Sequence, residues 1–545
     1  MNVMTSTPTT VVGALARTMA DLGMRHLFTL MGAGNLRLIH HLAEDHDVTV
    51  HHFRHENGAV GAADGYARVT GEVGWCTVTQ GPGFTNTITA LLTAHKGRSP
   101  VVMITSDSSS MDPLRFPFAG GVQGLDPEVI LAPLGIPVVR ATRDRCAADL
   151  IEAYQRATEE RCTVVFVIPT GMDLDPTAPA PASPFAGRGV SGSNLDEEAL
   201  TQAERLLRAA QRPLIVAGYG VHLAGAAGEV AELAERLGAH LATTAKSVGI
   251  FHGNSADLGI FGGFSPPEAA EIIEASDCIL AIGAGLNLFQ TRKNSFIEGR
   301  TVIQIDRDAA SFGRWSEPDL RVLGDARDAV ARLNRMLETI PPRPRVVAPS
   351  LAAFDDISVP GEIDPRTLSA ELDRALPAPR RILLDNGHFG AFPVLYMTHA
   401  QAGSVVWMPD FGAVGSALAA AAASAVSDPD LQSVLFIGDC GFYMTMGDLE
   451  TVVRERIPLV VVCMNDGAAG SELAHMKDWG VPPEQALFGY ADVAAAAAGM
   501  GATASRIDEV SELEPAIRAW DPQRGPLFLD CHVSREVRSP IYDHV

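Results

Sequence analysis

Cysteine is scarce in this sequence, and no two cysteines stand in a metal-binding or redox spacing. Seven occur among 545 residues, which is an odd number. None is paired with another across two intervening residues. The sequence therefore excludes a disulfide framework and a zinc site of the usual spacing. It indicates reduced thiols in a cytoplasmic protein.

Long apolar runs are also missing. A membrane-spanning helix needs about 18 or more consecutive apolar residues, and the sequence contains no such run. Residues 419–426 are rich in alanine, but the stretch is too short to cross a bilayer. Residues 1–10 lack a basic stretch followed by an apolar one, so we expect no signal peptide.

Basic residues are fewer than acidic residues in this sequence. There are 42 Lys and Arg against 65 Asp and Glu, giving a net charge of −23. Such a charge repels nucleic acid and anionic membranes, so we expect neither as a partner. Hydrophobic residues make up 47% and charged residues 20%, as in ordinary globular proteins. The length suggests about three or four domains.

Short apolar runs, bounded by turn residues and separated by helical patterns, recur along the chain. Continuous apolar character is typical of parallel strands covered on both faces, and alternation with helices indicates α/β layers. The runs that we predict as buried strands lie at 101–105, 163–168, 214–217, 278–282, 302–305, 382–384, 434–437, 459–464 and 527–529.

Two stretches, 173–194 and 341–360, have the proline-rich and small-residue composition of linkers. They divide the chain into three predicted domains, at 1–172, 195–340 and 361–545. We therefore predict three α/β domains, each a parallel sheet flanked by helices. The first and third each carry a glycine-rich segment with chemically active side chains, whereas the middle one has no clustered acids, bases or metal ligands.

In the first domain, Glu56 opens a helical pattern at 56–68 that is built largely from Gly and Ala. Small residues permit another helix or chain to approach closely, which would place this carboxylate in a desolvated position suited to proton exchange. A glutamate at a helix N-terminus can also serve only to complement the helix dipole. A second segment, 80–86, is a Gly/Pro turn after a strand, where backbone amides can face a ligand.

In the third domain, acidic turns follow two predicted strands. Asp439 comes directly after the strand at 434–437, and Asp466 follows the strand at 459–464. Ligands bind at the carboxyl ends of strands in open α/β sheets, and carboxylate oxygens suit Mg²⁺. Gly441 and Gly470 would let the backbone approach diphosphate oxygens closely. Two ordinary Asp-containing turns would be the simpler interpretation.

Together these segments resemble the thiamine-diphosphate enzymes, a family that includes acetohydroxyacid (acetolactate) synthase, pyruvate oxidase and benzoylformate decarboxylase. The family pattern is GDG, about two dozen residues, then NN, with an activating glutamate far upstream in an HE-x-x-A context. Residues 438–441, 465–470 and 55–59 match these motifs in that order. Residues 412–415 match the segment that touches the aminopyrimidine ring, and 385–388 match the start of the diphosphate-binding domain. The resemblance covers essentially the whole chain.

The resemblance implies a role for each matching residue, with thiamine diphosphate and Mg²⁺ as cofactors. Glu56 would activate the cofactor through the pyrimidine ring. The implied metal ligands are the side chains of Asp439 and Asp466 and the carbonyl of Ala468. The implied cofactor-binding residues are Gly387, His388, Gly412, Val414, Gly438, Cys440, Gly441 and Gly470. The implied substrate-pocket residues are Ala33, Thr79, Gln80, Phe84 and Gln123.

The sequence departs from the family pattern in three places. Cys440 replaces the second glycine of GDG, and Asp466 replaces the second asparagine of NN. Aspartate still offers an oxygen ligand, whereas a cysteine at 440 disfavours a positive φ. The segment 283–288 lacks the arginine-rich stretch of flavin-binding acetohydroxyacid synthases, which speaks against FAD.

The activity that the resemblance implies is decarboxylation of a 2-oxo acid, by default pyruvate, and transfer of the active aldehyde to a carbonyl acceptor. Thr79 and Ala33 stand where benzoylformate decarboxylase has a catalytic histidine and a pocket serine, so we favour carboligation. A non-ligating decarboxylase or acyloin lyase is the alternative, and a non-catalytic assembly or regulatory homologue is a third. The resemblance further implies a homodimer or homotetramer in which two chains share each active site.

Overall fold

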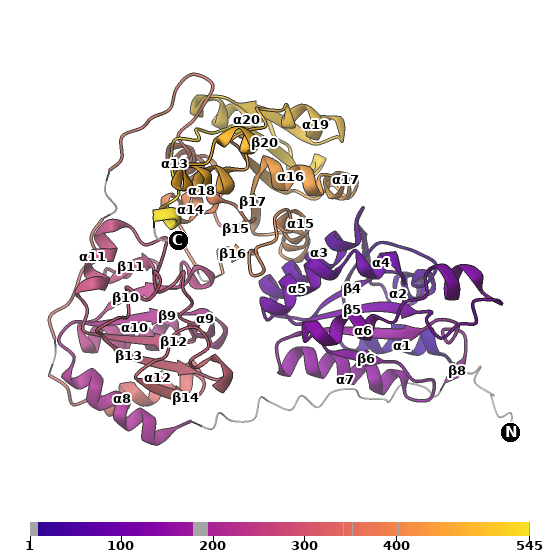
Figure 1. The fold of residues 1–545 in the computed structure, drawn as a ribbon, viewed down its shortest axis with the longest axis horizontal. Coiled ribbons are helices and arrows are strands. Elements are labelled where there is room, and N and C mark those ends of the chain that lie inside the picture. Colours follow the sequence, from indigo (N-terminus) through magenta and orange to yellow (C-terminus); the bar gives the residue numbers. More distant parts are fainter. Residues whose placement is uncertain (1–8, 178–194, 342, 351–352, 402, 544–545) are drawn as a thin grey trace.

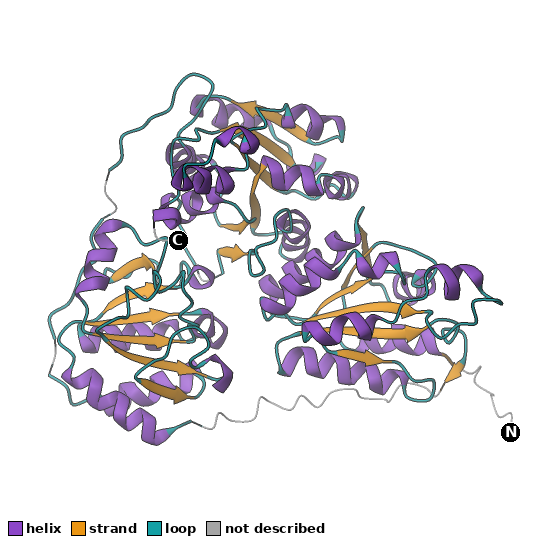
Figure 2. Ribbon diagram, viewed as in Figure 1, coloured by secondary structure: helices purple, strands orange, loops and turns teal. Residues whose placement is uncertain are grey.

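The computed structural model describes residues 9–177, 195–341, 343–350, 353–401 and 403–543. These residues form three lobes, each built on a six-stranded parallel sheet with helices on both faces (Figures 1 and 2). This confirms the predicted fold class. The predicted linker 173–194 lies largely outside the described residues, and so do residues 342, 351 and 352 of the linker 341–360.

The first sheet has the strand order β3-β2-β4-β5-β7-β6. The strands run outward from β2 in both directions, so the strand order changes direction between β2 and β4, as in other doubly wound sheets. Its strands are β2 (His26–Thr29), β3 (Thr49–His52), β4 (Gly74–Thr77), β5 (Val101–Asp107), β6 (Val138–Arg140) and β7 (Thr163–Pro169). Its helices are α1 (Val11–Asp21), α2 (Leu36–Asp45), α3 (Glu56–Thr70), α4 (Pro82–Thr85), α5 (Ile88–Lys96), α6 (Pro127–Leu131) and α7 (Cys146–Glu159). A π-helix, η1 (Pro117–Val122), and a 3-10 helix, η2 (Ala132–Leu134), complete the domain. A small antiparallel pair, β1 (Thr9–Thr10) with β8 (Pro176–Thr177), joins the two ends of this domain.

The middle sheet has the order β11-β10-β9-β12-β13-β14. Its strands are β9 (Pro213–Ala217), β10 (His240–Thr243), β11 (Asp257–Ile260), β12 (Cys278–Ile282), β13 (Thr301–Asp306) and β14 (Leu320–Leu323). Its helices are α8 (Glu197–Ala209), α9 (Tyr219–Ala224), α10 (Ala227–Leu237), α11 (Pro267–Ala275) and α12 (Ala326–Met336), with the turns η3 (Ala245–Ser247) and η4 (Ala309–Ser311).

The third sheet has the order β16-β15-β17-β18-β20-β19. Its strands are β15 (Arg380–Leu384), β16 (Val405–Trp407), β17 (Gln432–Gly438), β18 (Val460–Asn465), β19 (Thr503–Ile507) and β20 (Leu527–His532). Its helices are α13 (Pro365–Ala375), α14 (Ala391–Tyr396), α15 (Ala417–Ser427), α16 (Asp439–Thr445), α17 (Gly447–Arg454), α18 (Gly470–Trp479), α19 (Val493–Gly499) and α20 (Leu513–Ala519), with the turns η5 (His388–Gly390), η6 (Pro483–Ala486), η7 (Val510–Glu512), η8 (Pro522–Arg524) and η9 (Pro540–Asp543).

Helices α3 and α15 join the first and third domains, and they lie side by side where the two lobes meet (Figure 1). A Cβ added at Gly65 of α3 would lie 2.5 Å from the Cα of Ala420 in α15, so the backbones are nearly in contact. Residues of both helices belong to one buried cluster that spans the two domains. The Gly/Ala composition of 56–68 therefore serves a helix crossing between domains, as the sequence predicted for a close-packing surface.

All seven cysteines are described, and none forms a disulfide. Within the described residues, no helix is long and apolar enough to cross a membrane.

Candidate functional site

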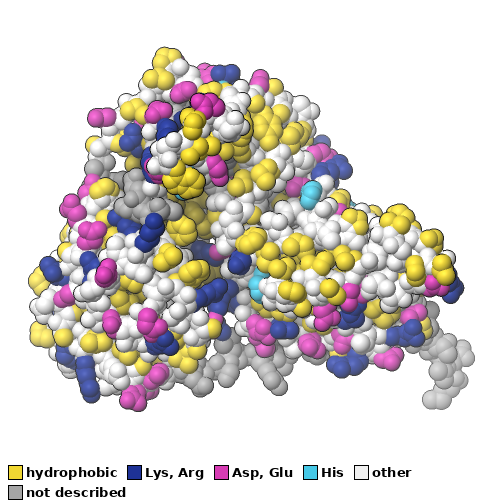
Figure 3. Space-filling model, viewed as in Figure 1, with side chains coloured by type: hydrophobic (Ala, Val, Ile, Leu, Met, Phe, Trp, Pro, Cys, Tyr) yellow, Lys and Arg dark blue, Asp and Glu magenta, His cyan; other side chains and the backbone are white. Residues whose placement is uncertain are grey.

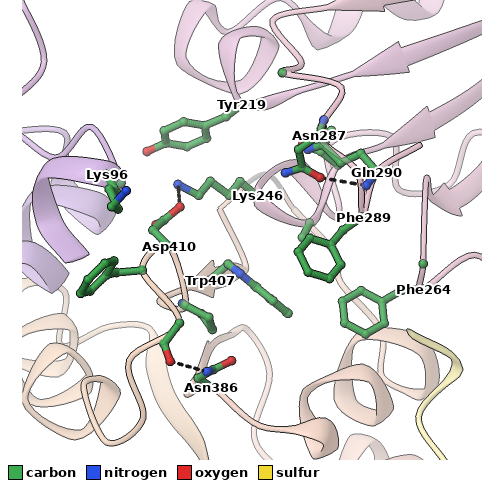
Figure 4. Close-up of a pocket in the computed structure, with 18 of the residues that line it drawn as sticks. Lys96, Tyr219, Lys246, Phe264, Asn287, Phe289, Gln290, Asn386, Trp407 and Asp410 are labelled. Atoms are coloured by element: carbon green, nitrogen blue, oxygen red, sulfur yellow. Dashed lines mark hydrogen bonds and ion pairs between the residues drawn. The ribbon is translucent and has the colours of Figure 1, made fainter. Parts of the chain in front are cut away.

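The main cavity lies where the three domains meet. It has a volume of about 1370 Å³ and is lined by the carboxyl ends of strands in the third domain, by loops of the middle domain, and by 96–98 and 159–161 of the first. Figure 4 shows side chains from all three domains pointing into it. The view in Figure 3 shows the same junction as a hollow where Lys and Arg side chains gather.

The third domain contributes its two predicted acids to this cavity. Asp439 is the first residue of α16, directly after β17, and Asp466 follows β18. Because β17 and β18 are hydrogen-bonded neighbours, their carboxyl ends place both side chains at one edge of the sheet. Both are buried, and no Lys or Arg forms an ion pair with either among the described residues. Burial raises the pKa of Asp439 to about 6. Burial, with the nearby charge of Asp439, raises the pKa of Asp466 to about 7.

Cys440 occupies the second residue of α16 and does not have a positive φ. The helical conformation of this turn explains why a side chain is tolerated where the family pattern has glycine. The Sγ of Cys440 donates to the carbonyl of Ala468 at 3.5 Å, which links the two acidic turns. Burial raises the pKa of this thiol to about 11, so it stays protonated near neutrality.

The glycine at 470 makes room for the side chains of Asp466 and His388. Gly470 is the first residue of α18, and a Cβ there would lie 2.4 Å from Asp466 Oδ2 and 2.5 Å from His388 Nδ1. His388 lies 3.8 Å from Asp466, and burial lowers its pKa to about 4, so it is neutral. Gly387 and Gly438 line the same end of the cavity.

These residues fit a diphosphate with a hard cation. Two buried carboxylates, a backbone carbonyl and the amino end of a ten-residue helix line the cavity together, and the glycine at 470 lets Asp466 and His388 lie against that helix end. Asp439, Asp466 and the Ala468 carbonyl would supply three oxygen ligands. Mg²⁺ commonly takes its remaining ligands from phosphate and water, so the set is chemically sufficient. Thiamine diphosphate, when bound here, would supply the stabilisation of negative charge at the reacting carbon.

The segment 410–415 forms another wall of the cavity. Gly412 and Gly415 have φ of 78° and 83°, a conformation that disfavours other residues. Val414 between them is 37% exposed, so an apolar side chain projects from a tightly turned backbone. The Nδ2 of Asn386 donates to the Gly412 carbonyl at 2.7 Å (Figure 4). A carbonyl oxygen has two lone pairs, so this bond leaves one for a ligand.

Asp385 holds the segment 410–415 in place through hydrogen bonds to backbone amides. Its carboxylate accepts from the backbone amides of Gly415 at 2.7 Å and Ala417 at 3.2 Å. A Cβ at Gly441 would lie 2.5 Å from Asp385 Oδ2 and 3.3 Å from Val414, which explains the glycine at 441. Burial raises the pKa of Asp385 to about 7.

Glu56 does not line this cavity. It is the first residue of α3, it is half-buried, and it accepts from Asn86 Nδ2 at 3.0 Å. The sequence suggested a desolvated carboxylate, but Glu56 remains partly exposed in the single chain because α15 covers the middle of α3 rather than its start. The two chemically active segments are thus separated within one chain.

The residues predicted around the substrate gather near Glu56 instead. A Cβ at Gly83 would lie 2.7 Å from Thr79 Cγ2 and 3.6 Å from Glu56 Oε1. Thr79 Oγ1 donates to Gln80 Oε1 at 2.8 Å, and Gln80 Nε2 donates to Gln123 Oε1 at 3.1 Å.

The loop of Ala33 joins this group. The Gly34 amide donates to Thr79 Oγ1 at 3.1 Å, and Ala33 itself is exposed. Phe84 is the exception, because it is fully buried in the cluster shared by the first and third domains. That burial is at odds with a direct contact with substrate, and we leave Phe84 out of the proposed site.

The contacts that support the cavity wall, and one cavity residue, were not identified from the sequence. Asp385 and Asn386 act through hydrogen bonds to a segment 26 to 32 residues away, which no local pattern reveals. Glu472, in the first turn of α18, brings a further carboxylate to the cavity. Its place just after Gly470 was the only signal available.

Three family models match the chain in the order of its domains. They are the thiamine pyrophosphate enzyme N-terminal TPP binding domain at residues 9–127, the central domain at 200–333 and the C-terminal TPP binding domain at 385–531. The chain belongs to the thiamine pyrophosphate enzymes.

Relatives of this thiamine pyrophosphate enzyme include both decarboxylases and synthases. The probable 2-ketoarginine decarboxylase of Pseudomonas aeruginosa is 29% identical over 534 residues, which cover 95% of this chain and 93% of that protein. The acetolactate synthase of Arthrospira platensis is 26% identical over 566 residues, which cover 96% of this chain and 94% of that protein.

Among solved structures, the thiamine diphosphate-dependent 4-hydroxybenzoylformate decarboxylase of Rhodococcus jostii RHA1 has a TM-score of 0.82. It is 20% identical, and the match covers 97% of this chain and 100% of that one. At this identity the likeness shows the fold.

Proposed function

We propose that this thiamine pyrophosphate enzyme uses thiamine diphosphate and Mg²⁺ to decarboxylate a 2-oxo acid and to transfer the remaining acyl unit to a carbonyl acceptor. The observation that carries the proposal is that Asp439, Asp466, Ala468 and Gly470 all line one cavity, with Gly470 directly beside the Asp466 carboxylate. Asp439, Asp466 and the Ala468 carbonyl hold the metal. Gly387, His388, Gly438, Cys440, Gly441 and Gly470 surround the diphosphate. Gly412 and Val414 receive the pyrimidine ring.

We further propose that two copies of the chain complete each site. Glu56 and Thr79 lie outside the cavity that holds Asp439, so a single chain offers two half-sites. Both half-sites are accompanied by exposed apolar side chains. In the first domain these are Leu114, Phe116, Phe118, Val122 and Val129, and in the third domain they are Tyr443, Met444, Trp479 and Phe488. Burying such surfaces against a second copy would stabilise a homodimer, and a tetramer could form from two dimers.

Within this arrangement Glu56 holds a proton at the pyrimidine ring of the cofactor bound by the partner. Its position at the start of α3, beside Asn86, leaves one face of the carboxylate open to a ligand. Contact with a second chain would remove water from that face, which completes the desolvation that the sequence suggested. Thr79, Gln80, Gln123 and the loop of Ala33 would then border the reacting carbon as a hydrogen-bonded wall.

The hydrogen-bonded group of Thr79, Gln80 and Gln123 favours carboligation. Its members are a hydroxyl and two amides already bonded to one another, and none is an acid or base that would deliver a proton. A second carbonyl compound then competes well for the reacting carbon. The likeness to acetolactate synthases supports this proposal, with pyruvate as the default donor.

Decarboxylation without ligation is the second candidate, and two observations favour it. Glu472 brings a possible proton donor to the cavity from the third domain. The relative with the higher identity of the two described above is named a decarboxylase.

Product analysis separates the two candidates. The protein is incubated with a panel of 2-oxo acids, thiamine diphosphate and Mg²⁺, with and without an added aldehyde, and CO₂ and product masses are measured. Hydroxyketone formation supports carboligation, whereas free aldehyde under both conditions supports the decarboxylase. A protein that binds no thiamine diphosphate in calorimetry would contradict both, and would favour the non-catalytic homologue.

The role of Glu56 is tested by Glu56→Gln. We expect turnover to fall by about 100-fold to 10,000-fold, the range typical of a lost acid–base group, while thiamine diphosphate still binds. Glu44→Gln, at an exposed glutamate of the same domain, is the control and should keep wild-type turnover. A Glu56→Gln protein with the wild-type rate would contradict the assignment.

A further inference from the structure

A buried ion-pair network joins all three domains at Asp410, two residues before Gly412. Lys246 Nζ of the middle domain lies 2.5 Å from Asp410 Oδ1 (Figure 4). Arg68 NH1 of the first domain lies 2.5 Å from Asp410 Oδ2. One carboxylate of the third domain therefore receives a cation from each of the other two.

The network continues into the core of the first domain. Arg68 pairs with Asp64 through two bonds of 2.7 and 2.9 Å, and its NH1 also donates to the carbonyl of Trp407 at 2.8 Å. Ser99 Oγ donates to Asp64 Oδ1 at 2.5 Å. Arg68 is thus bonded on one side to its own helix and on the other to the strand end and loop that lead to Gly412.

The charges in this network balance, with two cations and two carboxylates. The exposed fractions of the Arg68, Asp410 and Lys246 side chains are 7%, 13% and 23%. Burial opposes ionisation of Asp410, but Arg68 and Lys246 outweigh it and hold its pKa below the ordinary value. Burial lowers the pKa of Lys246, and the charge of Asp410 opposes that shift. Removing one member would leave a buried charge uncompensated.

The segment that follows is held from its other end too. Asp385 accepts from the amides of Gly415 and Ala417, and Asn386 donates to the Gly412 carbonyl. Residues 411–414 are therefore held on one side by the ion pairs of Asp410 and on the other by the hydrogen bonds of Asp385. Phe411 and Val414 have exposed fractions of 43% and 37%, so packing covers only part of each side chain, and Lys96 Nζ lies 5.5 Å from the centre of the Phe411 ring.

We propose that Asp410 is a positioning residue whose ion pairs with Arg68 and Lys246 hold 411–414 ready for the pyrimidine ring of thiamine diphosphate. The inference rests on the proposed function, because it takes Gly412 and Val414 as cofactor contacts. It adds that cofactor affinity depends on contacts from the first and middle domains that never touch the cofactor. It also gives Lys246, on a domain without proposed catalytic residues, a definite role.

Lys246→Met tests the proposal, because it removes one cation while leaving the pairs among Arg68, Asp64 and Asp410. We expect the Kd for thiamine diphosphate, measured by calorimetry with excess Mg²⁺, to rise by about 5-fold to 30-fold. Amides of 408–416 should exchange faster with deuterium in the cofactor-free protein, while exchange elsewhere is unchanged. Lys246→Arg keeps the charge and should restore the Kd to within about threefold of wild type.

The matched control is Glu455→Gln. Glu455 pairs with His51 at 2.6 Å, so it also bridges the first and third domains, but it does not contact 407–415. A purely structural role for Lys246 predicts that both variants lose thermal stability and neither changes the Kd. A wild-type Kd and wild-type exchange of 408–416 in Lys246→Met would overturn the proposal.

Exchange in the wild-type protein provides a measurement that needs no variant. The proposal requires 408–416 to be protected before cofactor is added, and free exchange of these amides in the cofactor-free protein would contradict it. If wild-type protein binds no thiamine diphosphate at all, the proposed function fails first. If wild type binds and Lys246→Met binds equally well, only this inference fails.

Discussion

The crossing of α3 and α15 makes a sharp prediction for Gly65→Ala. Alanine is the better helix former, and the exchange alone would stabilise a helix interior by about 1 kcal/mol. At this position, however, the new Cβ would lie 2.5 Å from the Cα, 2.6 Å from the Cβ and 2.7 Å from the carbonyl oxygen of Ala420. Favourable carbon contacts lie at about 3.5–4.0 Å, so the helices must separate by about 1 Å.

Two of the three opposing atoms are backbone, and no side-chain rotation relieves the overlap. Overpacking of this kind typically costs 1–3 kcal/mol, and we take about 3 kcal/mol because only helix movement can absorb it. Subtracting the gain in helix propensity leaves a net loss of about 2 kcal/mol. Amides of 56–70 should then exchange with deuterium about 30-fold faster, since 1.4 kcal/mol corresponds to a factor of ten.

The control is Gly228→Ala in α10, where an added Cβ meets nothing within 4 Å. The same substitution should leave exchange of α10 unchanged or slow it by up to about fivefold, because only the helix propensity acts. Unchanged or slower exchange of 56–70 in Gly65→Ala would refute the reasoning that close backbone approach, rather than chance composition, explains the glycine.

Three further predictions concern single side chains. Asp439→Asn should weaken thiamine diphosphate binding in the presence of Mg²⁺ by at least about 100-fold, and chelation of the metal from wild type should do the same in calorimetry. Glu472→Gln should lower turnover while leaving the cofactor Kd within about twofold, which steady-state rates and calorimetry separate. Burial, assisted by His51, lowers the pKa of His26 to about 4, so unfolding takes up a proton as the pH falls from about 6.5 towards 4, and stability declines across that range. His26→Gln should flatten this decline in melting temperatures compared at pH 7 and pH 5, and an equal decline in both proteins would count against it.

Much of the architecture could be predicted because it is encoded locally. All nine apolar runs interpreted as buried strands correspond to strands of the three sheets, since strands covered on both faces must be apolar throughout. Several strands escaped prediction because they lie at sheet edges and mix polar with apolar residues. β19 (Thr503–Ile507) is an example, with four of its five residues not fully buried. An edge strand has a neighbouring strand on one side only, so its side chains are less buried and polar residues are tolerated there.

The acidic turns were likewise predictable, because Asp439 and Asp466 each follow directly on a buried strand. A parallel sheet brings neighbouring carboxyl ends together whatever the intervening sequence, so two such turns imply one site. The supporting contacts were not predictable. Asp385, Asn386 and the Asp410 network act across distances in sequence that only the packing of domains closes.

Glu56 shows most clearly which features the sequence determines and which depend on the tertiary structure. The sequence alone determined that a carboxylate stands at the head of a Gly/Ala helix and that two strand-end acids could hold a metal and a diphosphate. Only the tertiary structure decided that these groups do not share a cavity within one chain. The reason is the α3–α15 crossing, where the missing side chain of Gly65 lets the helices pack backbone to backbone and fixes the direction in which Glu56 faces. That packing leaves Glu56 half-buried and outside the cavity that Asp439 and Asp466 line.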